Sequence, residues 1–178
     1  MKELVPRAVI GVMGSSRLAH SKRSRRIGEW LARSGYHLLT GGGPGVMAAV
    51  SEAFVGVIPR AGCSIGILPS ALDDPTGAPL GYPNPWVEIA IRTHLDRHEL
   101  AGDHRTSRNH LNVLSSDVLI VLPGAAGTAS EARLAIRYGR PCIAYLDNRL
   151  DVPGLPSIVR VEPKFEDVQC FVREVCTA

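Results

Sequence analysis

The stretch DVLIVLPGAAGT, residues 117–128, decides the fold of this chain of 178 residues. Residues 118–122 are wholly apolar and rich in β-branched side chains, which is typical of a strand buried on both faces of a sheet. Glycines follow at once, and an amphipathic helix that ends near Tyr138 comes next. A strand, a glycine-rich turn and a helix in this order form the repeating unit of parallel α/β sheets.

The same unit recurs on both sides of this stretch, because short apolar runs alternate with amphipathic segments along the chain. Repeated units joined by right-handed crossovers predict a Rossmann-like, doubly wound, mainly parallel sheet with helices on both faces. We expect a single α/β domain over residues 1–178. The expected strands cover residues 8–14, 36–40, 64–69, 86–91, 117–123, 141–146 and 157–161, and the expected helices cover residues 21–34, 46–54, 106–115 and 165–175, besides the helix that ends near Tyr138.

Residues 70–104 depart from this alternation. They combine a stretch rich in proline and glycine with a polar loop that contains histidines. We expect an insertion within the domain that forms a mobile flap over the ligand site. His94 and His98 stand four residues apart, a spacing that places two metal ligands on one face of a helix, but the sequence supplies no third ligand. We therefore expect no metal site.

The composition limits the classes of partner. The formal net charge is only +3, and the one basic cluster, Lys22, Arg23, Arg25 and Arg26, suits the solvated face of a helix better than a nucleic-acid footprint. No apolar run approaches the roughly 18 residues of a membrane span. The four cysteines lack CxxC or zinc-ligand spacing, which indicates a reducing compartment. We expect a cytoplasmic protein that binds neither nucleic acid nor membrane.

Three turns follow expected strands and are candidates for a ligand site: GSSR (residues 14–17), TGGGPG (residues 40–45) and PGAAGT (residues 123–128). Ligands of open α/β sheets bind at the carboxyl ends of the strands, where glycines allow close backbone approach and a helix start favours an anion such as phosphate. The alternative is tight turns that hold no ligand. The expected phosphate- or ligand-binding residues are Gly14, Ser15, Ser16, Gly41, Gly42, Gly43, Gly45, Pro123, Gly124, Ala125, Ala126, Gly127 and Thr128.

Two common nucleotide-binding motifs do not fit these turns. Gly43, Gly45 and Ala48 satisfy the G-x-G-x-x-A pattern, but this pattern follows the second strand, and no acidic residue ends the next strand to hold a ribose. Neither glycine-rich turn carries the G-K-[ST] of a P-loop. The sequence therefore disfavours a dinucleotide site and a P-loop NTPase.

Two charged side chains are candidates for catalysis. Glu131 lies one helical turn beyond residues 123–128, where its carboxylate could face a sugar, and Arg108 precedes the strand at 117–123 with five hydrogen-bond donors for phosphate or a leaving group. Each has a structural alternative. Thr128 and Glu131 match the T-x-x-E capping box of a helix start, and Arg108 could form a surface salt bridge.

The segments TGGGPGVM (residues 40–47), SRN (residues 107–109) and LPGAAGTASE (residues 122–131) resemble the LOG, or lysine-decarboxylase-like, Rossmann superfamily. This superfamily includes cytokinin riboside 5′-monophosphate phosphoribohydrolases and molybdenum cofactor carrier proteins. The resemblance spans roughly residues 9–145 and implies a homodimer with the site near the dimer interface. It places the catalytic arginine of the superfamily on Arg108 and its motif glutamate on Glu131.

The chain departs from the pattern of the phosphoribohydrolases at three positions. Ala125 replaces the second glycine of the P-G-G-x-G-T-x-x-E motif. Asn109 stands where the hydrolases usually have lysine, and Ser130 stands where they have the first of two successive glutamates. These choices are similar to the molybdenum cofactor carrier branch.

The resemblance leaves two functions open. The first is a nucleoside 5′-monophosphate phosphoribohydrolase that releases a purine-type base and ribose 5-phosphate with no cofactor. In this function Glu131 stabilises the positive charge on the ribose or orients water, and Arg108 positions the substrate and helps the base to depart. The alternative is a non-enzymatic carrier of molybdenum cofactor, a phosphorylated pterin. A nucleotide sensor that signals through a partner is a third, weaker hypothesis.

Overall fold

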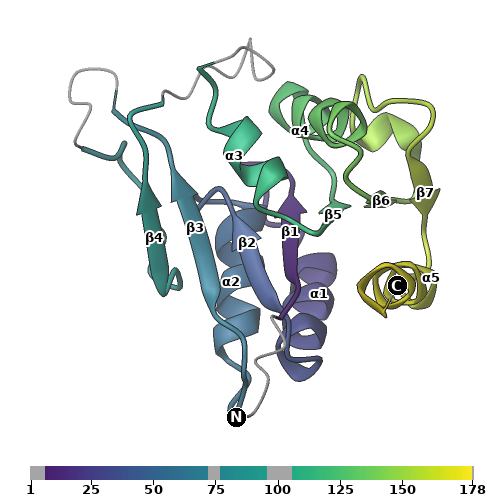
Figure 1. Ribbon diagram of the computed structural model, residues 1–178, viewed down its shortest axis with the longest axis horizontal. Coiled ribbons are helices and arrows are strands. Elements are labelled where there is room, and N and C mark those ends of the chain that lie inside the picture. Colours follow the sequence, from purple (N-terminus) through teal and green to yellow (C-terminus); the bar gives the residue numbers. More distant parts are fainter. Residues whose placement is uncertain (1–6, 72–76, 96–105, 178) are drawn as a thin grey trace, which may run out of the picture.

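The computed structural model describes residues 7–71, 77–95 and 106–177 (Figure 1). One sheet of seven strands has the order β4-β3-β2-β1-β5-β6-β7, and every neighbouring pair is parallel. The strands are β1 (Val9–Met13), β2 (His37–Thr40), β3 (Ser64–Leu68), β4 (Ile89–Arg92), β5 (Val118–Val121), β6 (Cys142–Tyr145) and β7 (Arg160–Glu162). The helices are α1 (Ser21–Arg33), α2 (Val46–Val55), α3 (Asn109–Leu114), α4 (Ala126–Arg137) and α5 (Phe165–Thr177), with a short 3-10 helix, η2 (Arg149–Asp151).

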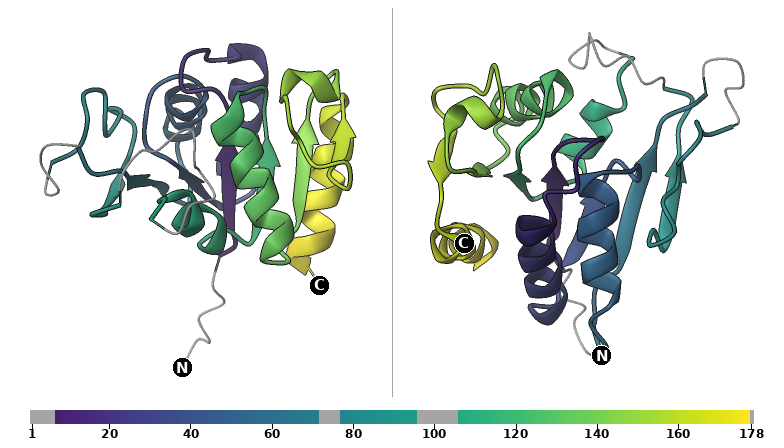
Figure 2. Two further views of the ribbon diagram at one scale, coloured as in Figure 1. Left: turned by 90° about the horizontal axis from the view of Figure 1, so that it is seen from above. Right: turned by 180° about the vertical axis from the view of Figure 1, so that it is seen from behind.

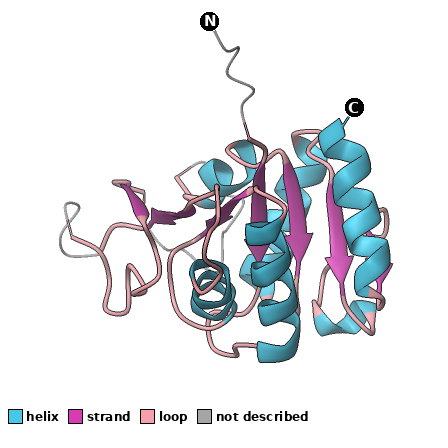
Figure 3. Cartoon of the chain, turned by 90° about the horizontal axis from the view of Figure 1, so that it is seen from below, coloured by secondary structure: helices cyan, strands magenta, loops and turns pink. Residues whose placement is uncertain are grey.

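Helices cover both faces of the sheet (Figure 2, Figure 3). On one face, α1, α2 and α5 bury a core in which Val12 of β1 and Phe54 of α2 have no exposed surface. On the other face, α3 and α4 cover a second core that contains Leu119 of β5, Val113 and Ala132. Because neighbouring residues of a strand point to opposite faces, the unbroken apolar runs of β1 and β5 serve both cores. The predicted Rossmann-like, doubly wound fold is confirmed.

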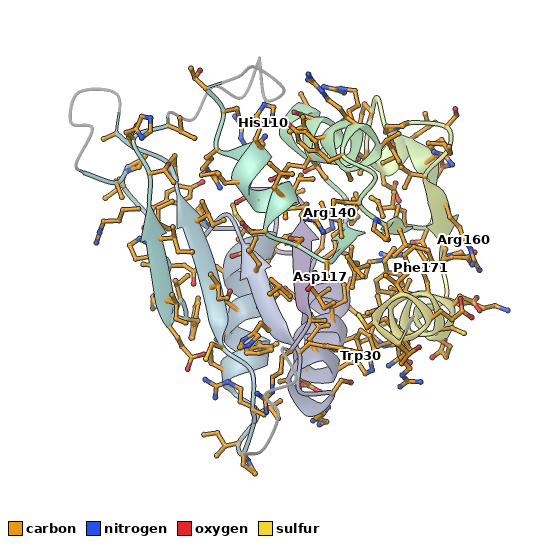
Figure 4. All side chains as sticks on the ribbon, viewed as in Figure 1. Trp30, His110, Asp117, Arg140, Arg160 and Phe171 are labelled. Atoms are coloured by element: carbon orange, nitrogen blue, oxygen red, sulfur yellow. The ribbon has the colours of Figure 1, made fainter. Side chains whose placement is uncertain are left out.

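Helices α1 and α5 pack through aromatic side chains. Trp30 of α1 meets Phe165 of α5 edge to face with ring centroids 5.8 Å apart, and Figure 4 shows Trp30 and Phe171 in the same layer. The basic cluster lies on the outer side of α1, where Arg25 is 77% exposed and pairs with Glu29 at 2.7 Å. The predicted solvated face is thus present, although Arg23 is largely covered and pairs with Asp147.

The expected elements are present, with shifted ends. The strand expected at 86–91 begins only at Ile89, because the backbone N–H of Val87 turns back to the carbonyl of Asn84. The strand expected at 157–161 becomes β7 at 160–162, since a turn closed by Val159 and Pro156 precedes it. Turn-forming backbone hydrogen bonds, which the apolar pattern does not report, set both boundaries.

The expected insertion at 70–104 is described only in part, because residues 72–76 and 96–105 lie outside the described residues. The described part contains β4, which pairs with β3 at the edge of the sheet. Mobility of this segment stays a prediction. Within the described ranges, no helix is both long and apolar enough to cross a lipid bilayer.

Candidate ligand-binding site

The site lies where the sheet changes the direction of its winding. Strands β1 and β5 are neighbours, yet α1 follows β1 onto one face and α4 follows β5 onto the other. The carboxyl ends of two such strands leave a crevice, which is where ligands bind in open α/β sheets. A pocket of about 300 Å³ opens there. It is lined by Val12, Met13, Gly14, Ser15, Ser16, Arg17, Gly41, Met47, Tyr82, Ser107, Arg108, Asn109, Ala125, Ala126, Gly127, Thr128 and Glu131.

The backbone of Ser15 joins the three turns expected from the sequence. Its N–H donates to the carbonyl of Pro123 at 3.0 Å, and its carbonyl accepts from the N–H of Val46 at 2.8 Å. Its side-chain oxygen also accepts from the backbone N–H groups of Arg17 and Leu18, which holds the loop after β1 in place. The three turns are therefore one connected structure at the end of the sheet.

The fold does not require a glycine at the position of Gly127. A β-carbon at this position would find no atom of the described residues within 4 Å, and the backbone has no positive φ. Gly127 nevertheless lines the pocket, in the first turn of α4, where backbone N–H groups lack partners within the helix. The missing side chain leaves room for a ligand to approach these N–H groups. This combination fits an anion such as phosphate.

The glycines after β2 are required for a different reason. A side chain at Gly43 would overlap the ring of Tyr82, and one at Gly45, which has a φ of 71°, would collide with the carbonyl of Ser15. Their lack of side chains is explained by the packing of the protein against itself. The expected binding residues that do not line the pocket are Gly42, Gly43, Gly45, Pro123 and Gly124.

Arg108 is buried at the start of α3, with only 8% of its surface exposed. Its Nη1 donates to the carbonyl of Ile67 at 3.0 Å, and its guanidinium lies against the α-carbon of Gly41. The guanidinium carbon also lies 5.8 Å from the ring centroid of Tyr82, within cation–π range. Arg108 is therefore a largely buried cation in the pocket wall.

Glu131 lies on the inner face of α4 and is 8% exposed. Its Oε1 accepts a hydrogen bond from Nδ2 of Asn112 at 2.9 Å. Burial raises the pKa of the Glu131 carboxyl, while the hydrogen bond from Asn112 and the charge of Arg108 act in the opposite direction. A carboxyl group poised in this way can exchange a proton nearer to neutral pH than an exposed one.

The T-x-x-E capping box considered for Thr128 and Glu131 is wrong. Helix α4 begins at Ala126 with Ala125 as its N-cap residue, and no side chain caps it. Thr128 is therefore the third helical residue, and its side chain packs against Gly124. Glu131 lies one turn further inside the helix, so its carboxyl is free of any capping role.

The raised pKa of Glu131 predicts a pH-dependent stability difference in Glu131→Gln. The folded state holds the proton more tightly than the unfolded chain, so ionising this buried group lowers stability as pH rises above the ordinary value of 4.5. Glutamine keeps the acceptor for Asn112 and carries no charge. Chemical unfolding of both proteins from acid to neutral pH should show similar stabilities in acid and a growing advantage of the variant toward neutral pH. A difference in stability that does not change with pH would contradict the raised pKa of Glu131.

Several residues that line the pocket were not expected as binding residues from the sequence, among them Arg17, Met47 and Tyr82, and Asn112, which contacts Glu131, was not expected either. Tyr82 comes from the irregular segment between β3 and β4, where no periodic pattern assigns a direction to a side chain. Asn112 is fully buried on α3 and donates to Glu131, and its Oδ1 has no hydrogen-bond partner among the residues that the structure describes. The sequence carried no clear signal for Asn112, because the positions three and four residues away on the same side of the helix are also polar.

The histidines form no metal centre in the described part of the chain, where no group of three or more histidine, cysteine, aspartate or glutamate side chains could hold an ion. His98 lies outside the described residues. His110 of α3, labelled in Figure 4, instead contacts the hydroxyl of Tyr138 at the end of α4, with 2.6 Å between Nδ1 and the oxygen. This contact ties the two helices that carry Arg108 and Glu131.

Comparison with known proteins places the chain among the Rossmann-like proteins of the LOG superfamily. The sequence model of the SLOG cluster4 family matches residues 7–161. An uncharacterized protein of Archaeoglobus fulgidus is 31% identical over 133 residues, which cover 74% of this chain and 75% of that protein.

Two similar solved structures are molybdenum cofactor proteins. The molybdenum cofactor carrier protein of Chlamydomonas reinhardtii is 27% identical with a TM-score of 0.71, and the match covers 97% of this chain and 100% of that chain. The molybdenum cofactor binding protein of Rippkaea orientalis is also 27% identical, with a TM-score of 0.70 and coverage of 97% and 99%.

A third structure is alike in fold alone. DNA processing protein A of Helicobacter pylori, which binds single-stranded DNA, is 20% identical with a TM-score of 0.68, over 94% of this chain and 80% of that one. The expectation that this chain binds no nucleic acid stays a prediction.

Proposed function

This chain belongs to the SLOG cluster4 family, and on that premise we propose that it is a nucleoside 5′-monophosphate phosphoribohydrolase. One observation carries the proposal: a single pocket is lined by the first turn of α4, by the buried cation Arg108 and by the buried carboxyl of Glu131. The first turn of α4 suits the phosphate, the carboxyl of Glu131 suits the positive charge of the transition state, and Arg108 suits the departing base. The reaction requires no cofactor.

The phosphate is bound at the start of α4. The backbone N–H groups of Ala126, Gly127 and Thr128 lie in the first turn of this helix, where the helix dipole favours an anion. The side chain of Ala125, in place of the usual glycine, belongs to the same rim of the pocket. The phosphate fixes one end of the substrate, so the ribose extends toward the pocket wall that carries Glu131.

Chemistry takes place at the anomeric carbon of the ribose. As the bond to the base breaks, positive charge develops on the ribose ring, and the carboxylate of Glu131 stabilises this charge. Water then adds its oxygen to the anomeric carbon, and one of its protons passes to Glu131 and on to the departed base. Arg108 holds the substrate, and its charge lowers the pKa of Glu131 and so favours the carboxylate.

The test is direct incubation of the purified protein with adenosine 5′-monophosphate and with an N6-modified analogue, followed by chromatographic detection of the free base. We expect stoichiometric release of base and ribose 5-phosphate. Absence of base release from either nucleotide and from guanosine 5′-monophosphate would contradict the hydrolase.

A second candidate function is a molybdenum cofactor carrier. It is supported by the two molybdenum cofactor proteins at 27% identity and by Asn109 and Ser130, which depart from the hydrolase pattern. The first turn of α4 would hold the phosphate of the pterin, and Glu131 would bind the ligand without turning it over. Pterin fluorescence of the protein as purified, and titration with a phosphorylated pterin, test this function. The homodimer and the cytoplasmic location also stay predictions.

Both functions predict that Gly127→Ala separates binding from stability. Within the described ranges the added methyl group meets no protein atom, so we expect no loss of stability and a gain of up to about 1 kcal/mol from helix propensity. The same methyl group blocks the approach of phosphate, so affinity for ribose 5-phosphate should fall by about 10-fold or more, roughly 1.4 kcal/mol.

Gly139→Ala is the matched control. Its φ is 63°, a β-carbon there would find no atom within 4 Å, and it lies outside the pocket. It should lose about 1–2 kcal/mol of stability through backbone strain and keep the affinity for ribose 5-phosphate. If Gly127→Ala and Gly139→Ala changed stability and affinity for ribose 5-phosphate in the same way, the assignment of Gly127 to the phosphate site would be refuted.

A further inference from the structure

Asn112 is a fully buried polar residue of α3 that the packing of the helix does not explain. Its Nδ2 donates to Oε1 of Glu131 at 2.9 Å, but its Oδ1 finds no hydrogen-bond partner in the described part of the chain. A buried acceptor without a partner lowers the stability of the folded state. An apolar residue in this place would avoid that cost. The asparagine is therefore better explained by what it does to Glu131.

The backbone of Asn112 is held at both of its polar groups. Its N–H donates to the carbonyl of Arg108 at 3.1 Å, and its carbonyl accepts from Oγ of Ser116 at 2.8 Å. Residues four apart lie on the same side of a helix, so Arg108 and Asn112 share one side of α3. This side of α3 carries a cation and an amide donor, and both act on the carboxyl of Glu131.

The hydrogen bond from Asn112 makes the two oxygens of the Glu131 carboxyl unequal. Oε1 accepts from the amide, and within the described ranges no donor is bonded to Oε2. The carboxyl itself lines the ligand pocket. In a protonated carboxyl the carbonyl oxygen is a better acceptor than the hydroxyl oxygen, so an N–H bonded to Oε1 favours a proton on Oε2. Oε2 is thus the oxygen left for the ligand and for a proton.

We propose that Asn112 is the positioning residue of Glu131, which holds Oε1 and presents Oε2 to the ligand as the atom that takes up and passes on a proton. The inference rests on the proposed function and adds the choice of atom within the carboxyl. In the reaction the bond between the base and the anomeric carbon breaks with its electron pair on the base, and the oxygen of water bonds to the anomeric carbon. One proton of this water passes to Oε2 and then to the base, while Asn112 keeps its bond to Oε1.

The experiment measures base release from adenosine 5′-monophosphate by wild type and Asn112→Leu over a series of pH values. Burial raises the pKa of Glu131 and the hydrogen bond from Asn112 opposes this rise, so loss of the amide should raise the pKa further. The acidic limb of the turnover number, which reports ionisation of Glu131, should therefore move to higher pH. The turnover number on the plateau should fall by about 10- to 100-fold with little change in the Michaelis constant, because Oε2 is no longer held in place.

Val113→Ala is the matched control for loss of packing on the same helix. Val113 is fully buried in the core that α3 and α4 cover, and it lies outside the ligand pocket. This variant should lose stability through the cavity that it leaves, and it should keep the turnover number and the acidic limb of wild type. If Asn112→Leu likewise lost stability without a change in turnover number or acidic limb, Asn112 would be a structural residue and the inference would be overturned.

A second measurement needs neither a variant of Asn112 nor turnover. In the nuclear magnetic resonance spectrum of wild type, the side-chain amide protons of Asn112 should shift as Glu131 ionises, because Nδ2 donates to Oε1. The shift should be absent in Glu131→Gln, which keeps an acceptor for Asn112 and does not ionise. Amide protons that stay constant in wild type over the whole pH range would overturn the inference, whether or not Asn112→Leu folds.

The outcomes separate this inference from the proposed function. If wild type releases no base but the amide protons of Asn112 follow the ionisation of Glu131, the hydrolase fails and Asn112 stands as the residue that orients this carboxyl in the pocket. If wild type releases base and Asn112→Leu keeps both its turnover number and its acidic limb, the hydrolase stands and the positioning role of Asn112 is overturned.

Discussion

Glu131→Gln is expected to slow release of the base from a nucleoside 5′-monophosphate by about 10²–10⁴-fold, with little change in the Michaelis constant. Glutamine has the shape of glutamate and keeps an acceptor for Asn112, which donates to Oε1 at 2.9 Å. The variant therefore preserves the packing and removes the negative charge alone. Since positive charge on the ribose develops only in the transition state, the loss should fall on the turnover number.

Base release over time, measured at saturating substrate, tests this expectation. Glu52→Gln is a suitable control, because Glu52 is exposed on α2 and lies outside the ligand pocket. It removes the same charge from the protein and should leave the rate unchanged. Full activity in a folded Glu131→Gln protein would remove Glu131 from the mechanism and favour the carrier function.

Arg108→Gln is expected to lower the same rate by about 10²–10³-fold. Arg108 is the buried cation of the pocket, and it donates to the carbonyl of Ile67 while its guanidinium lies beside the ring of Tyr82. Arg108→Lys should restore little of the activity, since a lysine ammonium lacks the planar shape that makes both contacts at once. Arg25→Gln, which changes an exposed arginine on α1, should have no effect on the rate.

The pH profile of Arg108→Gln gives a second readout that loss of packing alone would not produce. The charge of Arg108 lowers the pKa of Glu131, so its removal should raise this pKa further. The acidic limb of the rate profile, which reports ionisation of Glu131, should therefore move to higher pH. An acidic limb that stays in place would mean that Arg108 does not act on Glu131.

The fold was predictable because burial on both faces of a parallel sheet leaves a direct trace in the sequence. Strands such as β5 must be apolar at every position to serve both cores, and the glycines that end α1 and α4 must adopt positive φ, as Gly35 and Gly139 do. These are local requirements, so a single sequence reveals them. The expectation that Arg108 and Glu131 share a site came from the resemblance to the LOG superfamily, and both residues line the pocket.

The exact use of individual residues was less predictable. The difference between a cap and a functional carboxyl at Glu131 depends on whether α4 begins at Ala129 or, as it does, three residues earlier at Ala126, and the pattern T-x-x-E is compatible with both. Tyr82 reaches the pocket through a backbone path set by Asn84 and the carbonyls of Gly42 and Gly43. Such contacts join segments about forty residues apart in the sequence, and no spacing rule anticipates them.

The glycines of the two glycine-rich turns differ in how strictly related proteins must retain them. Gly43 and Gly45 are enclosed by Tyr82 and Ser15, so any descendant that keeps this architecture must keep them, whatever it binds. In the part of the chain that the structure describes, no neighbour of Gly127 excludes a side chain, so a descendant that abandoned its ligand would be free to replace it. Among relatives, retention of the first pair is a record of common ancestry, and retention of Gly127 is a record of continued selection for the ligand.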